Sequence, residues 1–301
     1  MPPRYDIEDL LQQARTKLAD NTESARLEAE ILLAFTLGKN RSWLRTWPDH
    51  VPSPEQQDTF DHLLMRRTAG EPIAYITGER DFWDMTLRVT PDTLIPRPET
   101  ERLVELALEH IPLAADWRIA DLGTGSGAIA LALARERPRC HLIATDVSAA
   151  TLQVARSNAK KLGIGNIEFR LGPWLAPLAG ERLALIASNP PYIHPDDPHL
   201  YRGDLRFEPA AALGSTPDGL HDIREIAHEA HEHLRPGGWL LLEHGYDQGS
   251  AVRAILAAQG YCEVATHSDL SGHDRISQGR TAPHTSPADI SGCAMITSEP
   301  P

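Results

Sequence analysis

The feature that most constrains the fold of this 301-residue chain is a predicted strand that runs directly into a glycine-rich turn and then into a helix. Residues 117–122 are predicted as the strand, residues 123–127 read Gly-Thr-Gly-Ser-Gly, and residues 128–134 continue as the helix. Glycine is favoured where the backbone must approach a ligand closely. The spacing, led by the acidic Asp121, differs from the G-x-G-x-x-G pattern that places a pyrophosphate at a helix N-terminus. We therefore predict a ligand without phosphate groups at this turn.

Helices and strands alternate on both sides of the glycine turn. The expected strands are 117–121, 141–145, 167–171, 183–188 and 239–243, and the expected helices are 99–110, 126–136, 148–162 and 220–234. A turn at Pro236-Gly237-Gly238 precedes the last of these strands, and a further helix and hairpin complete the pattern. Such alternation is typical of a parallel sheet covered by helices. The predicted fold class is therefore α/β, with a doubly wound sheet.

The first third of the chain has a different, helical pattern. Apolar residues recur at helical spacing over 7–18 and again over 27–35, and Ser53-Pro54-Glu55-Gln56 is the capping-box signature of a third helix. Alternating apolar residues within 72–89 predict a hairpin. The predicted organisation is a small helical domain over 1–70, a hairpin linker over 71–90, an α/β domain over 91–280, and a disordered tail rich in Pro, Ser and Thr over 281–301.

Composition and charge exclude several classes of function. The formal net charge is -13 and no basic run occurs, so we expect no direct binding to DNA. Residues 1–10 carry acids without an apolar run, and the apolar stretches are far shorter than a bilayer, so neither a signal peptide nor a membrane span is predicted. The cysteines are widely spaced and form neither a disulfide framework nor a metal quartet; they are Cys140, Cys262 and Cys293. We expect a cytoplasmic monomer.

The helix expected at 220–234 is rich in histidine. Its apolar residues form one stripe, made by Ile223, Ala227, Ala230 and Leu234. The histidines therefore fall largely on the solvated side of the helix; they are His221, His228, His231 and His233. The histidines and nearby acids lack a recognised ligand spacing, so no metal site is predicted.

Asp146 follows the strand at 141–145, the next strand after the glycine turn. A carboxylate at this place can accept hydrogen bonds from both hydroxyls of a ribose. Without a ligand, the glycines would form only a tight turn, and Asp146 would only cap the helix that begins at Ser148. The order of the two features favours ligand binding, and together they predict a nucleoside pocket.

The tetrapeptide Asn189-Pro190-Pro191-Tyr192 follows the strand at 183–188, at the sheet edge where open α/β sheets bind ligands. Proline has no N–H, so the local backbone offers carbonyl acceptors only, and Asn189 adds a side-chain carbonyl. A planar group carrying an NH2 could be held by the Asn189 oxygen and the Pro190 carbonyl while Tyr192 packs on its face. The predicted substrate group is therefore an amide or an exocyclic amine, although the same tetrapeptide could form a rigid surface turn.

These features resemble the class I S-adenosylmethionine-dependent methyltransferases, some of which carry Asn-Pro-Pro-Tyr and methylate either adenine in DNA or glutamine in proteins. Neighbouring motifs favour the second group; they are Leu94–Glu101, Asp121–Ala134, Asn189–Ile193, Phe207-Glu208-Pro209 and Leu241–Gly245. Over about residues 7–280 the chain is similar to the protein-(glutamine) methyltransferases that act on peptide chain release factors. The resemblance implies a mostly parallel seven-stranded sheet, preceded by the small helical domain.

The resemblance also implies a reaction, a cofactor and a partner. The enzyme would transfer a methyl group from S-adenosylmethionine to the side-chain amide nitrogen of the glutamine in the Gly-Gly-Gln motif of class I release factors. The helical domain would help to hold the release factor. The implied cofactor-binding residues are Asp121, Gly123, Thr124, Gly125, Ser126, Gly127, Asp146, Trp174 and Asn189. Asn189, Pro190 and Tyr192 would be catalytic and, with Pro191, would bind the glutamine.

Two positions need separate comment. Members of the family commonly have an acidic residue directly before the tryptophan beside the adenine, whereas this chain has Pro173 before Trp174. A carboxylate contact to the adenine amine is therefore not assigned, and the stacking surface of Trp174 is expected to preserve cofactor binding. Arg97 and Glu99 flank prolines before a helix, where they either order the loop over the cofactor or serve only the structure.

Three alternatives remain open at this point. A glutamine methyltransferase for a ribosomal protein would resemble this chain throughout the catalytic domain, so only the N-terminal domain could separate the two. An adenine methyltransferase would need a basic face and a target-recognition region, which the sequence lacks. A catalytically silent cofactor-binding protein would not require the intact loop at 189–192.

Overall fold

The computed structural model describes residues 5–194, 196–201, 203–215 and 218–283, so the tail predicted over 281–301 lies almost entirely outside the described residues. Two compact units are present. The first contains the chain up to Glu79 together with residues 89–91 and 201–207, and the second contains residues 80–88, 92–200 and the chain from Glu208 onward. No helix in the part of the chain described here is long and apolar enough to cross a membrane.

The first unit is helical. Its helices are α1 (Ile7–Leu18), α2 (Ala25–Leu37), α3 (Arg41–Thr46), α4 (Pro54–Thr68) and α5 (Ile73–Thr77). The predicted capping box is confirmed, because the Ser53 side chain accepts from the backbone N–H of Gln56 while the Gln56 side chain accepts from the N–H of Ser53. The core between these helices is mostly aliphatic and includes Ile7, Leu18, Leu32, Leu33, Leu44 and Phe60. Burial of this apolar stripe holds the short helices together.

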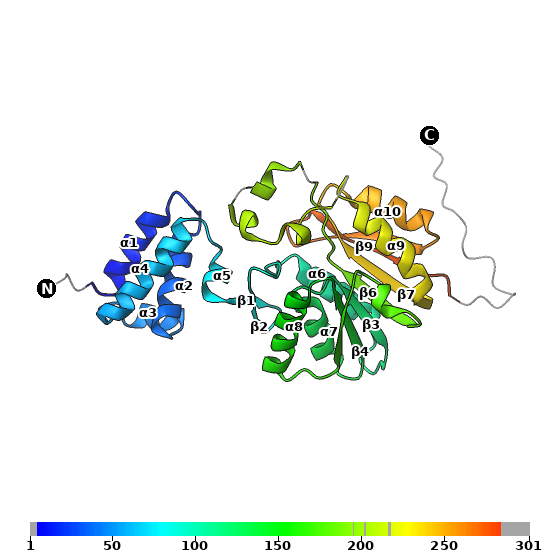
Figure 1. Cartoon of the computed structure of the whole chain (residues 1–301), viewed down its shortest axis with the longest axis horizontal. Helices are drawn as coiled ribbons and strands as arrows, with labels where there is room; N and C mark the ends of the chain where they lie inside the picture. The colour runs from blue at the N-terminus through cyan, green and yellow to red at the C-terminus, as the bar shows by residue number, and fades with distance from the viewer. Residues whose placement is uncertain (1–4, 195, 202, 216–217, 284–301) are drawn as a thin grey trace. The chain divides into compact units, whose positions relative to one another are not determined.

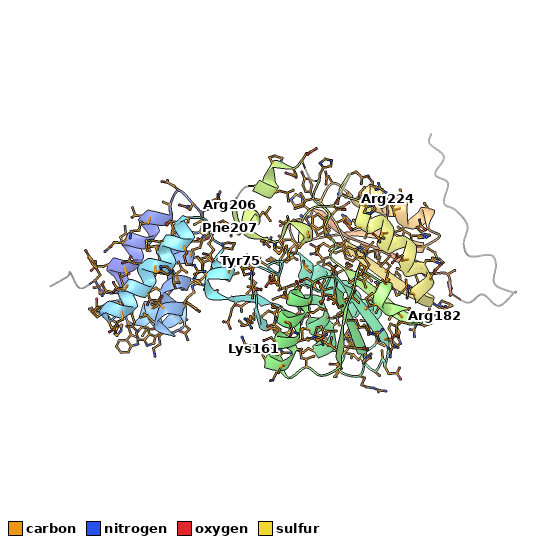
Figure 2. All side chains as sticks on the ribbon, viewed as in Figure 1. Tyr75, Lys161, Arg182, Arg206, Phe207 and Arg224 are labelled. Carbon is orange, nitrogen blue, oxygen red and sulfur yellow. The ribbon has the colours of Figure 1, made fainter. Side chains whose placement is uncertain are left out.

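A distant segment of sequence, residues 201–207, completes the helical unit. The buried guanidinium of Arg67 on α4 donates to the Glu28 carboxylate at 2.7 Å and to Asp204 at 2.7 Å. Arg206 donates to the backbone carbonyl of Ala69 at 2.8 Å. Figure 2 labels Arg206 and its neighbour Phe207 in this segment. The sequence showed no pattern that would place 201–207 with the helices, because the contacts depend on side chains more than 130 positions apart.

The second unit is built on a seven-stranded sheet with the order β5-β4-β3-β6-β7-β9-β8. The first five strands in this order run parallel, and β9 is antiparallel to both β7 and β8. The strands are β3 (Arg118–Leu122), β4 (His141–Asp146), β5 (Ile167–Leu171), β6 (Leu183–Ser188), β7 (Leu234–Glu243), β8 (Cys262–Ser268) and β9 (Asp274–Arg280). The predicted doubly wound, mostly parallel seven-stranded sheet is therefore confirmed.

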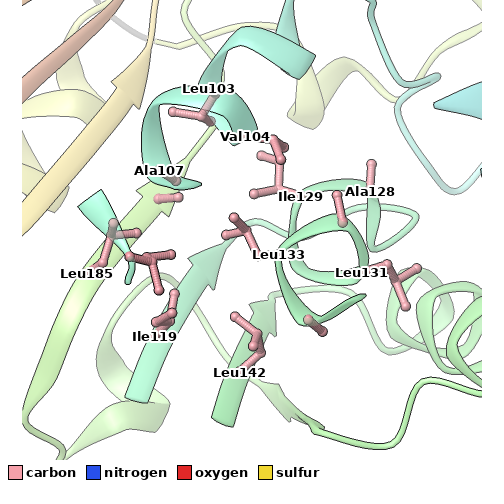
Figure 3. Close-up of a cluster of buried hydrophobic side chains, with 14 of the residues drawn as sticks. Leu103, Val104, Ala107, Ile119, Ala128, Ile129, Leu131, Leu133, Leu142 and Leu185 are labelled. Atoms are coloured by element: carbon pink, nitrogen blue, oxygen red, sulfur yellow. The ribbon is translucent and has the colours of Figure 1, made fainter. Parts of the chain in front are cut away.

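Helices cover both faces of this sheet (Figure 1). On one face lie α6 (Thr100–His110), α7 (Ala128–Glu136) and α8 (Ala149–Leu162), and on the other lie α9 (His221–His233) and α10 (Gly249–Ala258). Alternate residues of one strand enter different cores: Ile119 packs beneath α6 and α7, as Figure 3 shows, whereas Ala120 belongs to the core under α9 and α10. Because both faces are covered, ligands must reach the sheet at the ends of its strands.

Two local predictions differ from the structure. The alternation over 72–89 predicted a hairpin, but the hairpin is limited to β1 (Glu79–Phe82) and β2 (Met85–Arg88), and α5 occupies residues 73–77. Ile76 belongs to the helical core, and Pro72 precedes the first helical residue. The turn predicted at Pro236-Gly237-Gly238 is part of β7, whose pairing with β6 shifts register between Leu183 and Leu185. This irregularity accommodates the proline and the glycines inside the strand.

Candidate active site

The candidate site lies at the carboxyl edge of the sheet, where the strand order reverses between β3 and β6. Leu122, the last residue of β3, pairs in register with Ser188, the last residue of β6. The Ser188 hydroxyl also donates to the Leu122 carbonyl at 2.8 Å. Gly123 and Asn189 are the next residues of the two strands, so the glycine turn and the Asn-Pro-Pro-Tyr loop leave the sheet side by side.

The glycine turn needs glycine for two physical reasons. Gly123, Gly125 and Gly127 have φ angles of 68°, 59° and 89°, a region that other residues enter at a cost. A Cβ atom on Gly123 would lie 3.1 Å from Cζ3 of the Trp174 ring. The Trp174 ring therefore packs directly on the Gly123 backbone, whereas the space around Gly125 is open, with no atom within 4 Å of a Cβ placed there.

Asp121 is fully buried just before the turn. Its Oδ2 atom accepts from the Thr124 hydroxyl at 2.6 Å and from the backbone N–H of Ala130 at 3.1 Å. Among the described residues, Oδ1 of the same carboxyl has no hydrogen-bond partner. Burial raises the pKa of Asp121 to about 7, against the lowering effect of these two hydrogen bonds. A buried oxygen of this kind fits a cationic ligand group, such as an ammonium.

Asp146 joins the end of β4 to the glycine turn. Its Oδ2 accepts from the backbone N–H of Gly125 at 3.1 Å, and its Oδ1 accepts from the N–H of Ser148 at 2.9 Å. The cap on the following helix comes from Ser148, whose hydroxyl accepts from the N–H of Thr151. Asp146 is half-buried, and burial raises the pKa of its carboxyl. Each carboxylate oxygen retains capacity for a further donor, such as a ribose hydroxyl.

Trp174 follows β5 and is half-buried against the core under α9 and α10. Its backbone has a φ of 37°, which is unusual for a residue with a side chain. The hydroxyl of Thr145 on β4 donates to the Trp174 carbonyl at 2.9 Å and so supports this conformation. The preceding Pro173 is exposed.

The Asn-Pro-Pro-Tyr loop is held at three points. The Asn189 amide nitrogen donates to the Thr100 hydroxyl at 3.2 Å. The Tyr192 hydroxyl donates to Oε1 of Glu243 at 3.5 Å, and burial with the nearby Glu243 charge raises the pKa of Tyr192, which keeps the phenol protonated. The Gln248 amide donates to the Tyr192 carbonyl at 3.1 Å. With its NH2 group donating to Thr100, Asn189 keeps its side-chain oxygen as an acceptor.

The residues predicted from sequence are thus gathered at one edge, and the structure adds supporting residues that the sequence did not reveal. Gln248 is one of them, and Gly219 is another, because a Cβ atom there would lie 2.6 Å from the Tyr192 carbonyl. Thr100 and Glu243 occurred within family motifs without a role of their own. No spacing rule could have found these residues, since each contact joins separate strands or helices.

Two further sequence motifs contact each other, the segment before α6 that contains Arg97 and the segment Phe207-Glu208-Pro209. Glu208 is buried and accepts from the backbone N–H of Ile95 at 3.0 Å and from the Arg97 guanidinium. Arg97 therefore fixes the segment before α6 to the segment that follows Phe207.

The histidines of α9 lie outside the buried apolar stripe of that helix. His221, His228 and His231 are exposed, and His233 is half-buried.

Four features of this site together define the class I methyltransferases, which use S-adenosylmethionine. They are a parallel sheet whose strand order reverses, a glycine turn without the phosphate-binding pattern, an acid at the end of the next strand, and a proline loop rich in acceptors. Comparison with known families agrees: residues 113–277 match the methyltransferase domain, and residues 9–78 match the PrmC N-terminal domain. A solved methyltransferase structure from Pyrococcus furiosus supports the fold alone, with a TM-score of 0.51 and 17% identity over 74% of this chain and 99% of that one.

Curated relatives define the family more narrowly. Over 276 residues the chain is 51% identical to the release factor glutamine methyltransferase of Vibrio cholerae, covering 91% of this chain and 96% of that protein. It is 48% identical over 259 residues to the protein of the same name from Escherichia coli K12, covering 86% of this chain and 93% of that protein. The chain belongs to the release factor glutamine methyltransferase family.

Proposed function

We propose that this enzyme methylates the side-chain amide nitrogen of the glutamine in the Gly-Gly-Gln motif of class I peptide chain release factors. The observation that supports the proposal is the Asn-Pro-Pro-Tyr loop beside the glycine turn, because this loop would supply the Asn189 side-chain oxygen and the Pro190 carbonyl as acceptors. The names of the relatives support a release factor as the substrate. The match of residues 9–78 favours this substrate over a ribosomal protein, because only the helical domain could separate the two.

The edge of the sheet offers a suitable group for each part of S-adenosylmethionine. Oδ1 of Asp121, which has no partner among the described residues, would fit the amino group of the methionine part, and the open side of the turn at Gly125 would fit the chain that joins it to the ribose. Asp146 would hold the ribose hydroxyls, and the Trp174 ring would flank the adenine. The cofactor supplies an electrophilic methyl group on a sulfonium.

The loop at 189–192 would then prepare the glutamine amide. An amide nitrogen is a weak nucleophile because its lone pair is delocalised into the carbonyl group. Asn189 and Pro190 would accept its two hydrogens, which returns electron density to the nitrogen, while Tyr192 packs against the amide plane. Holding the nitrogen in line with the methyl group can contribute about 7–11 kcal/mol in well-oriented cases. The proton becomes acidic only after the nitrogen is alkylated, so no catalytic base is assigned.

The helical unit would provide the contact with the release factor outside the reacting loop. Its fixed segment 201–207 follows the Asn-Pro-Pro-Tyr loop in sequence and is anchored by Arg67 and Asp204. Within the helical unit, several apolar side chains are exposed, including Phe35, Trp47 and Met65. Exposed aromatic and methionine side chains are common in protein interfaces.

The direct test is mass spectrometry of a purified class I release factor after incubation with this enzyme and S-adenosylmethionine. We expect one added methyl group on the peptide that contains Gly-Gly-Gln, and no addition when that glutamine is replaced by alanine. Asn189→Ala provides a matched enzyme control. An enzyme that binds S-adenosylmethionine but leaves the release factor unmodified would contradict the proposal, and the ribosomal proteins would be assayed next.

A further inference from the structure

A buried carboxylate connects both ends of the Asn-Pro-Pro-Tyr loop. Glu243 is the last residue of β7 and is 1% exposed, and Thr100 is the first residue of α6 and is 4% exposed. Glu243 accepts from the Tyr192 hydroxyl at 3.5 Å, and the nearby Thr100 side chain lowers the pKa of its carboxyl. Thr100 in turn accepts from the Asn189 amide nitrogen at 3.2 Å. A buried carboxylate with no direct place in methyl transfer therefore contacts one loop residue and reaches the other through a hydroxyl.

The direction of these hydrogen bonds is set by the chemistry of the groups. A carboxylate can only accept, and a threonine hydroxyl has a single hydrogen to donate. When the Thr100 hydrogen is directed to Glu243, the Thr100 oxygen can serve Asn189 only as an acceptor. Asn189 must then turn its NH2 group to Thr100, which leaves its carbonyl oxygen for the substrate. The reverse orientation would present two more donors to a substrate group that is itself a donor.

We propose that Thr100 and Glu243 are positioning residues that hold the Asn189 side chain with its oxygen toward the substrate amide. The inference rests on the proposed function, because it assigns the orientation of the residue that receives the glutamine. Glu243 maintains this orientation through Thr100 and holds Tyr192 directly. Neither Thr100 nor Glu243 contacts the substrate in this scheme.

The surroundings of Glu243 agree with this role. Burial raises the pKa of its carboxyl to about 7, and the charge of Glu99 acts in the same direction. The side chains of Thr100 and Tyr192 and the charge of Arg275 on β9 lower the pKa. Among the described residues, Oε2 of Glu243 has no hydrogen-bond partner, so it can take up the hydrogen of the Thr100 hydroxyl that the proposal assigns to it. Natural sequences rarely keep such a buried charge unless its hydrogen bonds are used.

The test compares four variants of the full chain with the parent enzyme, at about pH 8, where the carboxylate form of Glu243 dominates. Thr100→Val removes the hydroxyl while preserving shape, and Thr100→Ser keeps the hydroxyl. Glu243→Gln introduces an NH2 that can donate to Thr100, which would turn the Thr100 hydrogen toward Asn189. Thr281→Val is the matched control, because Thr281 is also 4% exposed and, within the described part of the chain, its hydroxyl bonds backbone groups of Arg235 and Gly238.

We expect Thr100→Val to lower kcat by about 10- to 100-fold, the range seen when a supporting partner is removed, with the KM for the release factor changed by less than about threefold. Thr100→Ser should restore kcat to within about threefold of the parent, and Glu243→Gln should lose at least as much as Thr100→Val. Titration of S-adenosylmethionine should give similar affinities for all variants. Thr281→Val should retain the parent kcat.

Equal kcat values for Thr100→Val, Thr281→Val and the parent would overturn the inference. A loss in Thr100→Val that Thr100→Ser fails to recover would also overturn it, because packing would then explain the loss. If Thr100→Val does not fold, an unchanged kcat for Glu243→Gln overturns the inference and a reduced kcat supports it. Failure of the parent to methylate the release factor would instead count against the proposed function.

Discussion

Replacing Asp121 by asparagine should stabilise the free enzyme while weakening its hold on S-adenosylmethionine. The carboxyl group is fully buried, and one of its oxygens has no partner among the described residues. Asparagine has nearly the same shape and can still accept from Thr124 and Ala130 through its carbonyl oxygen. The substitution therefore removes the buried charge and leaves the local hydrogen bonds in place.

The magnitude follows from the shift in proton affinity. The pKa of Asp121 rises from 3.8 to about 7, chiefly because burial penalises the charged form. Each tenfold change in proton affinity corresponds to about 1.4 kcal/mol, so the charged form at about pH 8 costs the free protein roughly 4 kcal/mol. The new NH2 of asparagine lacks a partner in the free protein, which costs about 1–3 kcal/mol. The net expected stabilisation is about 1–3 kcal/mol.

The effect must depend on pH in a definite direction. The folded parent binds the Asp121 proton more tightly than the unfolded chain does, so the free energy of unfolding of the parent falls as pH rises from about 4 to about 7. The asparagine variant lacks this contribution. Glu243, whose pKa is also raised to about 7, contributes equally to both proteins and cancels in the comparison. The variant should therefore be less stable than the parent at about pH 4, where only the cost of its unpaired NH2 remains, and should reach its full advantage above about pH 8.

Urea unfolding with and without S-adenosylmethionine measures both effects. A ligand at 100 times its dissociation constant stabilises a protein by about 2.7 kcal/mol, and the variant should lose most of this gain because asparagine presents no charge to the cofactor ammonium. Asp116→Asn, which removes an exposed carboxylate from the same unit, is the control and should change neither quantity. A free variant that is less stable than the parent at about pH 8, or one that keeps its gain from the cofactor, would refute the reasoning.

Two further substitutions test the other sides of the site. Asn189→Ala should retain S-adenosylmethionine binding in a titration but slow methylation by about 10²–10³-fold, because a preorganised acceptor is lost; unchanged turnover would remove Asn189 from its proposed role. Gly123→Ala should weaken cofactor binding, because its Cβ would lie 3.1 Å from Trp174. Gly163→Ala is the control, because Gly163 has the same φ of 68° and open space around its Cβ. This control should cost about 1–2 kcal/mol of stability without changing the affinity for the cofactor. Equal affinities for the two variants would contradict the contact with Trp174.

The fold could be predicted from the sequence where a local signal and the three-dimensional environment agree. The strand at 183–188 was predicted with its observed bounds, because six apolar or small residues in a row suit a strand buried on both faces. The capping box at Ser53 marked the start of α4 for the same reason. The segment 72–89 failed because the true alternation is limited to β1 and β2, while the apolar residues of α5 pack against other helices.

The residues of the candidate site also fall into two groups, those that a local pattern places and those that it does not. The placement of Asp121, Asp146 and Asn189 at one edge of the sheet could be predicted, because each stands at or next to the end of a strand, and parallel strands bring their ends to one edge. The residues that hold them could not be predicted in this way. The contact between Asn189 and Thr100 spans 89 positions, and that between Tyr192 and Glu243 spans 51. Such contacts depend on the register of strands and the docking of helices, which no local period encodes.

The arrangement of acceptors also determines how many methyl groups the enzyme should add. In the proposed binding mode, the unmodified glutamine amide gives one hydrogen to Asn189 and one to Pro190, whereas the methylated amide has only one hydrogen to give. A second transfer would leave one of the two acceptors unpaired and would place the first methyl group against it. An unpaired buried acceptor costs about 1–3 kcal/mol, which lowers a rate by roughly 5- to 150-fold before any steric clash is counted. Mass spectrometry after prolonged incubation should therefore show one methyl group on the glutamine, and rapid formation of a dimethylated product would show that the two acceptors do not hold the amide in this way.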